Sequence, residues 1–259
     1  MPDVNFPAVI STPATSIEEV IKQLTAIVEW SKQNNSRMGY FAALYRKVTI
    51  QVGKGIQENY FDDGPRMERL DVIFANRYIH AFYLYHTGQT PTQSWIRAFN
   101  ATKYWWPIVL QHLLLGMNAH INLDLGIAAA ETVPPEELQN LKSDFEKINQ
   151  VLASLVGGVQ TELAEIWPIL GFFNRYLGSA ETAIINFSME KARNAAWSFA
   201  QKLSPLSDEL RQQTIARKDE EMALFSRVIS HPGLQGSMIL GTIRLGERGT
   251  IQKCIEILE

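Results

Sequence analysis

The chain has little cysteine and no long hydrophobic run. Its only cysteine among 259 residues is Cys254, so no disulfide can form within the chain, and we expect a protein of the reducing cytoplasm. The N-terminal residues lack the basic segment and the long apolar run of a signal peptide. No stretch reaches the roughly 18 uninterrupted apolar residues of a membrane helix, so no integral membrane segment is expected.

The common catalytic and nucleotide-binding signatures are also missing. The sequence contains no glycine-rich phosphate loop, no GxSxG elbow, no CxxC pair and no HExxH helix. Net charge is −3 and no basic block occurs, which argues against a nucleic-acid partner. We therefore expect the partner to be a small molecule of largely apolar character. The sequence is also compatible with a homo-oligomer.

What the chain does contain is helical periodicity along almost its whole length. Apolar residues recur three and four positions apart, and Ser16 followed by Glu19 is a capping box. Asp63 or Gly64 can cap a helix whose first turn contains Pro65. This pattern predicts an all-α protein, a single compact helical domain built around a buried central helix. Residues 1–15 are expected to be extended, 16–232 to form the domain, and 233–259 to pack on it as a partly helical tail. The expected helices cover 16–31, 37–56, 64–86, 94–102, 107–131, 136–156, 179–203 and 204–230. Gly157 and Gly158 are expected to interrupt the helix that begins at 136, which then resumes to 167. A kinked apolar connection is expected to follow, with Ser179 as the cap of the next helix.

The central helix carries the most unusual pattern, in the stretch HLLLGMNAHINLDLG at residues 112–126. His112, Gly116, His120 and Asp124 are each four residues apart, so they form one ladder along one side of a helix. Gly116 is expected to leave space between the two histidines, and Glu131 to extend the acidic end. His112, His120 and Asp124 are the candidate catalytic residues.

A metal centre is the first functional hypothesis. Two side chains at i and i+4 can hold one ion, and two histidines with a carboxylate are the minimum set for catalytic zinc or for iron. The candidate ligands are His112, His120 and Asp124, with Asp71 as a further one. One divalent ion there would activate water for a hydrolase acting on an ester or phosphoester.

Other polar residues are candidate substrate contacts or structural supports. Asn118 and Asn122 form a second i, i+4 pair on the opposite side of the helix, and Arg77 is a candidate to hold an anionic group. Arg193 is a second such candidate. It is also expected to pair with Asp144 or Asp124, since buried charges require partners.

Two alternatives need no metal. The polar ladder is compatible with hydrogen bonds that only join the central helix to its neighbours. It is equally compatible with a cyclase, an isomerase or a hydrophobic-ligand carrier, in which His112 or His120 acts as general acid or base. Trp95, Trp105 and Trp106 would then line an apolar pocket, although plain core is the simpler interpretation. His80 and His86 are expected at the surface.

Parts of the sequence resemble a known family, and this resemblance points to particular residues but implies no activity. The segments FDDGPRMERLDVIFANRYIHAF, SWIRAFNA, WWPIVLQHLLLGMNAHINLDLGIAAAE, SDFEKINQVLASL and MEKARNAAWSFAQKL resemble a large bacterial family known only as a domain of unknown function. The likeness covers about residues 36–205. It implies a helical fold and directs attention to the following residues: Asp71, Asn76, Arg77, His112, Asn118, His120, Asn122, Asp124, Asp144 and Arg193. Of these, Asn76 and Asp144 are expected to have structural or supporting roles.

The pair formed by His120 and Asp124 is also similar to the helical HxxxD metal pair of zinc-dependent phospholipases C and single-strand nucleases. That likeness implies an all-helical fold with histidine and aspartate ligands. The chain departs from the pattern because it has five histidines in all and no second histidine soon after Asp124. It therefore implies one or two metal ions rather than a trinuclear cluster.

Overall fold

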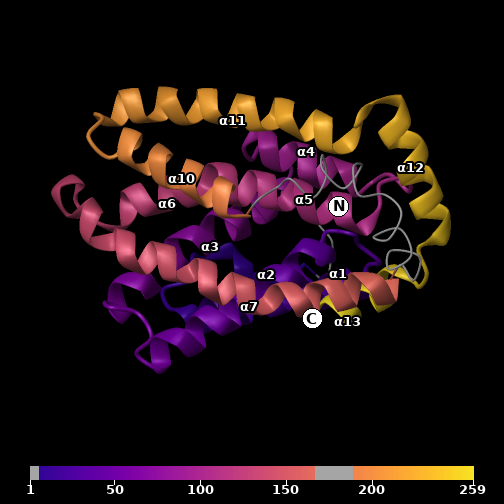
Figure 1. The fold of residues 1–259 in the computed structure, drawn as a ribbon, viewed down its shortest axis with the longest axis horizontal. Helices are drawn as coiled ribbons and strands as arrows, with labels where there is room; N and C mark the ends of the chain where they lie inside the picture. The colour runs from indigo at the N-terminus through magenta and orange to yellow at the C-terminus, as the bar shows by residue number, and fades with distance from the viewer. Residues whose placement is uncertain (1–5, 167–188) are drawn as a thin grey trace.

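The structure, a computed structural model, describes residues 6–166 and 189–259. The described residues form helices and contain no strand, which confirms the expected all-α class (Figure 1). The α-helices are α1 Ile17–Gln33, α2 Gly39–Gln57, α3 Gly64–His86, α4 Gln93–Ala101, α5 Val109–Ala119, α6 Leu125–Thr132, α7 Lys142–Ile166, α10 Met189–Leu203, α11 Asp208–Ser230, α12 Gly233–Gly246 and α13 Ile251–Leu258. Short 3-10 helices cover Ala8–Ser11 and Pro135–Leu141, and a π-helix covers His120–Asp124.

The helix starts follow the capping residues seen in the sequence. The Ser16 side chain accepts a hydrogen bond from the backbone of Glu19 at 3.3 Å and begins α1. The Glu19 carboxylate does not return to Ser16, because it accepts instead from the backbone N–H of Thr15 at 2.7 Å. Asp63 caps α3 by accepting from the backbone of Arg66 at 2.9 Å. Both expected starts are therefore confirmed, the first with half of its capping box.

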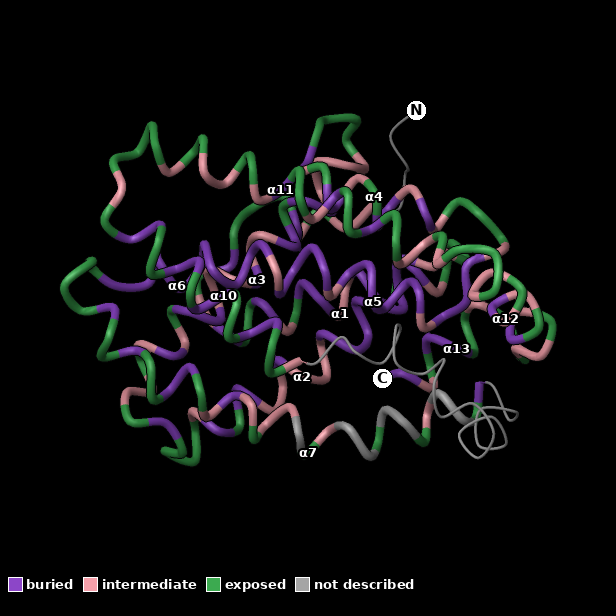
Figure 2. Tube along the Cα trace, turned by 45° about the horizontal axis from the view of Figure 1, so that its top comes forward, coloured by how far each residue is buried: buried purple, intermediate pink, exposed green. Residues whose placement is uncertain are grey.

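The middle of the fold is the continuous helical segment Val109–Thr132. It is long and apolar enough to cross a membrane, but 83% of its 18-residue apolar stretch is buried inside the fold. Helices α2, α4 and α11 pack against α5, and α3 and α10 pack against α6, so neighbours surround this segment (Figure 2). Leu115, Leu123 and Ile127 are completely buried. The segment is thus the core helix that the sequence predicted.

Two of the expected helices differ in detail from the structure. The central helix is not regular, because the π-helical turn separates α5 from α6. Helix α7 continues through Gly157 and Gly158, so the expected interruption there is wrong. The C-terminal tail forms two helices, and Ile255 and Leu258 of α13 are buried where α13 meets α1, α2 and α7. The expected cap at Ser179 and the kinked apolar connection near it lie outside the described residues.

Candidate functional site

Asp124 of the central helix lies within hydrogen-bonding distance of three polar side chains. Its Oδ1 accepts from Arg77 Nε at 2.8 Å, and its Oδ2 accepts from the indole N–H of Trp95 at 2.8 Å. His120 Nδ1 lies 3.5 Å from the same Oδ2. The Asp124 side chain is only 1% exposed. A carboxylate this deeply buried requires such partners, and here both of its oxygens have them.

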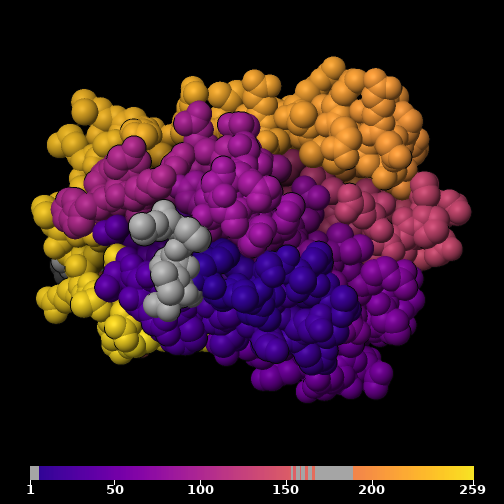
Figure 3. Space-filling view, turned by 180° about the vertical axis from the view of Figure 1, so that it is seen from behind, coloured from indigo at the N-terminus to yellow at the C-terminus, as the bar shows by residue number. Residues whose placement is uncertain are grey.

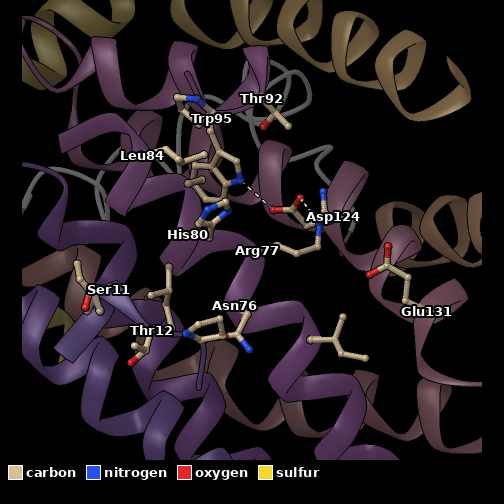
Figure 4. Close-up of a pocket in the computed structure, with 16 residues that line it drawn as sticks. Ser11, Thr12, Asn76, Arg77, His80, Leu84, Thr92, Trp95, Asp124 and Glu131 are labelled. Carbon is tan, nitrogen blue, oxygen red and sulfur yellow. Dashed lines mark hydrogen bonds and ion pairs between the residues drawn. The ribbon is translucent and has the colours of Figure 1, made fainter. Parts of the chain in front are cut away.

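Three separate parts of the chain bring these groups together. Arg77 comes from the middle of α3, Trp95 from the first turn of α4, and Asp124 from the end of the π-helical turn (Figure 4). His120 is the first residue of that turn. That turn is closed by a backbone hydrogen bond from Leu125 N to His120 O, one residue longer than the α-helical bond. Single π-helical turns within α-helices occur frequently at functional sites.

His120 lies in an aromatic cage behind Asp124. The Phe74 ring stacks on the imidazole with centroids 3.6 Å apart, and the Tyr45 ring meets it edge-on at 4.4 Å. Burial lowers the pKa of His120, although the neighbouring Asp124 carboxylate opposes that shift. Its Nε2 has no hydrogen-bond partner among the described residues. His120 is therefore a neutral imidazole that faces Asp124 and the protein interior.

The charge on Asp124 is retained in this environment. Burial raises the pKa of the Asp124 carboxyl, but the Arg77 guanidinium and the hydrogen bonds from His120 and Trp95 outweigh burial. The net result is a pKa below the ordinary value. Asp124 is thus an ionised carboxylate near neutral pH, held in a fixed orientation by N–H donors.

A cavity of about 430 Å³ opens beside this cluster. That volume suits a small organic molecule. One wall is a stripe along α3, and the others come from the N-terminal segment, the approach to α4 and the end of α6 (Figure 4). Its lining is Ile10, Ser11, Thr12, Pro13, Ile73, Asn76, Arg77, Ile79, His80, Ala81, Leu84, Pro91, Thr92, Trp95, Asp124 and Glu131.

Arg77 is the charged group with unused donors in this cavity. Its Nε donates a hydrogen bond to Asp124, but its two terminal nitrogens form no hydrogen bond with any described residue. The Arg77 side chain is 25% exposed, and the residue lines the cavity. A guanidinium whose two terminal nitrogens carry four unused N–H donors is suited to a planar anionic group such as a carboxylate.

His112 does not join this cluster. It precedes His120 by eight positions and Asp124 by twelve, about 12 and 18 Å along a helix. Its ring lies 5.7 Å from that of Tyr40, and burial together with Arg37 and Arg244 lowers the pKa of His112 to about 3. The expected ladder therefore divides into two separate environments.

The space expected at Gly116 is filled. The Phe41 ring occupies it so closely that a Cβ built on Gly116 would lie 2.4 Å from a ring carbon. The glycine thus serves close packing of α2 on α5, and it does not open a path between His112 and His120.

Asp71 lies apart from the cavity. It is buried on α3, its Oδ2 has no partner among the described residues, and burial with the nearby Glu68 raises its pKa to about 7. Within the described ranges no group of three or more histidine, cysteine or acidic residues could hold a metal ion. Asp124 presents both oxygens to N–H donors, one of them on a cationic arginine. The candidate ligands therefore do not form a set that fits the expected metal centre.

Asn118 and Asn122 face helix α11 on the other side of the central helix. Asn118 donates to the backbone oxygen of Met222 at 2.8 Å and to the Ser226 hydroxyl at 3.0 Å. Asn122 donates to the side chain of Asn118 at 3.0 Å. The i, i+4 pair exists as its spacing suggests, but it ties α11 to the core and does not line the cavity.

Arg193 and Asp144 form contacts that join parts of the fold and lie outside the cavity lining. Arg193 donates to the backbone oxygen of Phe145 and lies over its ring at 4.5 Å. Asp144 accepts from Arg66 at 2.9 Å and from the backbone of Asp62 and Asp63. The expected pairs of Arg193 with Asp144 or Asp124 are therefore not formed.

Asn76 exchanges two hydrogen bonds with the backbone of Ala14, at 2.8 and 2.9 Å. These bonds join the N-terminal segment to α3 and keep that segment in place as a cavity wall. Asn76 therefore links α3 to the N-terminal segment.

Sequence reasoning missed part of the cavity wall. His80 is exposed as expected, but it lies on the cavity one helical turn from Arg77. The signal was present as the spacing of Ile73, Arg77, His80 and Leu84, which places them on one side of α3. Trp95 was expected to belong to the core or to line a pocket. No spacing in the sequence predicts its hydrogen bond to Asp124, because the two residues are 29 positions apart. Trp105 and Trp106 do not line this cavity.

Comparison with known proteins gives one match. A family model described as a family of unknown function (DUF5995) matches residues 17–232, which is most of the chain. No curated protein and no solved structure matches.

Proposed function

The chain belongs to DUF5995, a family of unknown function, and we propose from the geometry of its cavity that it binds a small organic anion with an apolar body. The observation that carries the proposal is the Arg77 side chain, which lines a cavity of about 430 Å³ with Nε bound to Asp124 and both terminal nitrogens without a partner among the described residues. This is the metal-free form of the two functional hypotheses that the sequence suggests.

Asp124 and Trp95 act as positioning residues in this proposal. A free arginine side chain has many rotamers, and ordering it on binding would cost conformational entropy. The hydrogen bond to Asp124 holds the guanidinium before a ligand arrives, and the indole N–H of Trp95 holds Asp124 in turn. Such preorganisation supports binding of an anion at a site that already contains a carboxylate.

The apolar walls define the rest of the ligand. Ile10, Ile73, Ile79, Leu84 and Pro91 line the cavity around Arg77. Burying hydrocarbon against them contributes about 25 cal/mol for each Å² removed from water. A carboxylate joined to an aliphatic or aromatic body therefore matches the cavity better than a phosphosugar or another highly polar anion.

His80 makes proton transfer a second candidate function. It lines the same cavity, and on a helix a residue at i+3 projects from the same side as Arg77. A histidine near neutral pH can accept or donate a proton at a ligand held by Arg77. His120 is not suited to that role, because it is 2% exposed and does not line the cavity.

Calorimetric titration with matched probes tests the proposal. Octanoate and 3-phenylpropionate carry the anionic group, while 1-octanol and 3-phenylpropanol keep only the apolar body. We expect the carboxylates to bind at least about tenfold more tightly, because the alcohols cannot form charged hydrogen bonds with Arg77. Equal binding of acid and alcohol, or binding of neither, would count against the anion site.

A variant on the cavity wall gives the specific control. His80→Glu places a carboxylate one turn from Arg77, and we expect it to reduce carboxylate binding about tenfold or more while leaving alcohol binding unchanged. Gln89→Glu adds the same charge at an exposed position that does not line the cavity, and it should bind like the wild type. A similar loss in both variants would indicate a general effect of net charge.

A further inference from the structure

Helix α12 exposes large apolar side chains along one side. Leu234, Met238 and Leu245 are 82%, 70% and 80% exposed. Positions four and eleven residues apart differ by about 40° and 20° around a helix, so the three side chains project in one direction. The helix lies at one edge of the molecule, where the C-terminal residues are yellow (Figures 1 and 3), and much of it is exposed (Figure 2). We call this side of α12, together with Tyr104 and Trp105, the α12 face.

The opposite side of α12 is fixed to the protein. Leu240 and Ile243 are buried against Ile108, with Trp106 and Leu110 beside them. The exposed apolar residues of the α12 face are therefore not the side by which α12 packs on the protein core. They are a second apolar side on a helix whose first apolar side is already packed, and apolar surface of this kind marks interaction sites.

Two aromatic residues extend the α12 face. Tyr104 and Trp105, in the loop before α5, are 63% and 60% exposed. The Arg244 guanidinium of α12 lies 4.7 Å from the centre of a Trp105 ring, which holds this loop beside the helix. Exposed Trp and Tyr next to protruding aliphatic side chains are typical of surfaces that enter the headgroup region of a membrane.

The chain segment that contains α12 carries basic residues and no acidic ones. Residues 222–246 contain Arg227 and Arg244 but no aspartate or glutamate, in a chain whose net charge is −3. Lys103, Arg227 and Arg248 are exposed. The next acidic residue, Glu247, has a side chain that is 6% exposed; it accepts from the backbone of Val109 at 2.7 Å and pairs with Arg244. Its charge is therefore directed inward.

We propose that the α12 face is a peripheral membrane-binding surface for bilayers that contain anionic phospholipid. The aliphatic side chains would insert at the boundary of the headgroups and acyl chains, and the arginines and lysine would contact lipid phosphates. This inference is independent of the anion site at Arg77, because it concerns another surface and no residue is shared. It adds an attachment of the folded protein to a lipid surface, without a membrane-spanning helix.

Charge also argues for a bilayer over a second copy of the chain. A two-fold dimer formed through the α12 face would bring the same patch against itself. Arg227, Arg248 and Lys103 would then meet like charges, since the segment 222–246 offers no carboxylate to pair with them. An anionic lipid surface supplies the missing opposite charge.

Cosedimentation with vesicles tests the proposal. The full chain is mixed with vesicles of phosphatidylcholine alone or of phosphatidylcholine with phosphatidylglycerol. We expect at least about tenfold stronger binding to the anionic vesicles, and a decrease as salt is raised. The triple variant Leu234→Ser, Met238→Ser and Leu245→Ser should lose at least about tenfold in binding.

Matched controls separate the outcomes. Leu210→Ser removes an exposed leucine (52%) from α11, outside the α12 face, and should bind vesicles like the wild type. All variants change exposed residues, so circular dichroism and thermal unfolding should match the wild type. Absence of binding to anionic vesicles, or full binding by the triple variant, would overturn the proposal. A third result would also overturn it: light scattering shows a dimer for the wild type and a monomer for the triple variant, and neither protein binds vesicles. The α12 face would then bind a second copy of the chain.

Discussion

The guanidinium of Arg77 donates from Nε to Oδ1 of Asp124 over 2.8 Å, which joins α3 to the π-helical turn of the central helix. The two residues are 47 positions apart in the chain. Asp124 is buried and Arg77 is one quarter exposed, so the pair combines a fixed interior charge with donors that face the cavity. Both the stability of the core and the proposed anion site depend on this contact.

Removal of the Arg77 charge should destabilise the protein. In Arg77→Gln the Asp124 carboxylate stays buried without its cationic partner, and such a loss costs about 3–5 kcal/mol in the free energy of unfolding. We expect the lower end, because solvent reaches Arg77. Urea unfolding measures the change. Arg97→Gln is the control, since Arg97 is exposed on α4 and forms no ion pair with a described residue; it should change stability by less than about 0.5 kcal/mol. Equal effects in the two variants would contradict this account.

Trp95→Phe should cost stability through one hydrogen bond as well as through packing. The variant removes the indole N–H that donates to Asp124 Oδ2, and a buried charge-assisted hydrogen bond contributes about 1–3 kcal/mol. Trp105→Phe removes an indole that is 60% exposed and should be close to neutral. Thermal unfolding of both variants tests the difference. A Trp95→Phe protein as stable as Trp105→Phe would show that the contact to Asp124 is unimportant.

Asp71 should make the protein less stable as pH rises. Burial and Glu68 raise its pKa in the folded state to about 7, while the unfolded carboxyl keeps its ordinary value of 3.8. The folded state thus binds the proton more tightly, so stability contributed by protonated Asp71 is present below about pH 4 and is lost as pH rises toward 7. A pKa raised from 3.8 to about 7 corresponds to roughly 4 kcal/mol in the free energy of unfolding. We expect Asp71→Asn to remove most of this slope in unfolding free energy measured from pH 4 to 8. An unchanged slope would assign the pH dependence to other groups.

Two helical glycines should respond to alanine in opposite directions. Gly116→Ala would place a Cβ 2.4 Å from the Phe41 ring, and such overpacking costs about 1–3 kcal/mol, more than alanine gains in helix propensity. Gly241→Ala in α12 meets nothing within 4 Å and should stabilise by about 0.5–1 kcal/mol. Chemical denaturation of the two variants provides the comparison. Stabilisation by Gly116→Ala would show that Phe41 moves away at little cost.

The sequence by itself determined the features that depend on local spacing. Helical periodicity predicted the all-α class, and the capping residues Ser16 and Asp63 predicted where α1 and α3 begin. The pairs His120–Asp124 and Asn118–Asn122 also followed from the sequence, because residues four apart on a helix are neighbours whatever surrounds them. These features need only the backbone geometry of one helix.

Only the tertiary structure decided which residues share a site. Local spacing cannot show that Asp124 pairs with Arg77 rather than Arg193, or that Trp95 supplies its second donor. Nor can it show that Phe41 fills the space at Gly116 and leaves His112 in a separate environment. The physical reason is that these contacts join helices far apart in the chain. Their partners are selected by how whole helix faces pack, and a polar group in the core takes whichever donor that packing brings within reach.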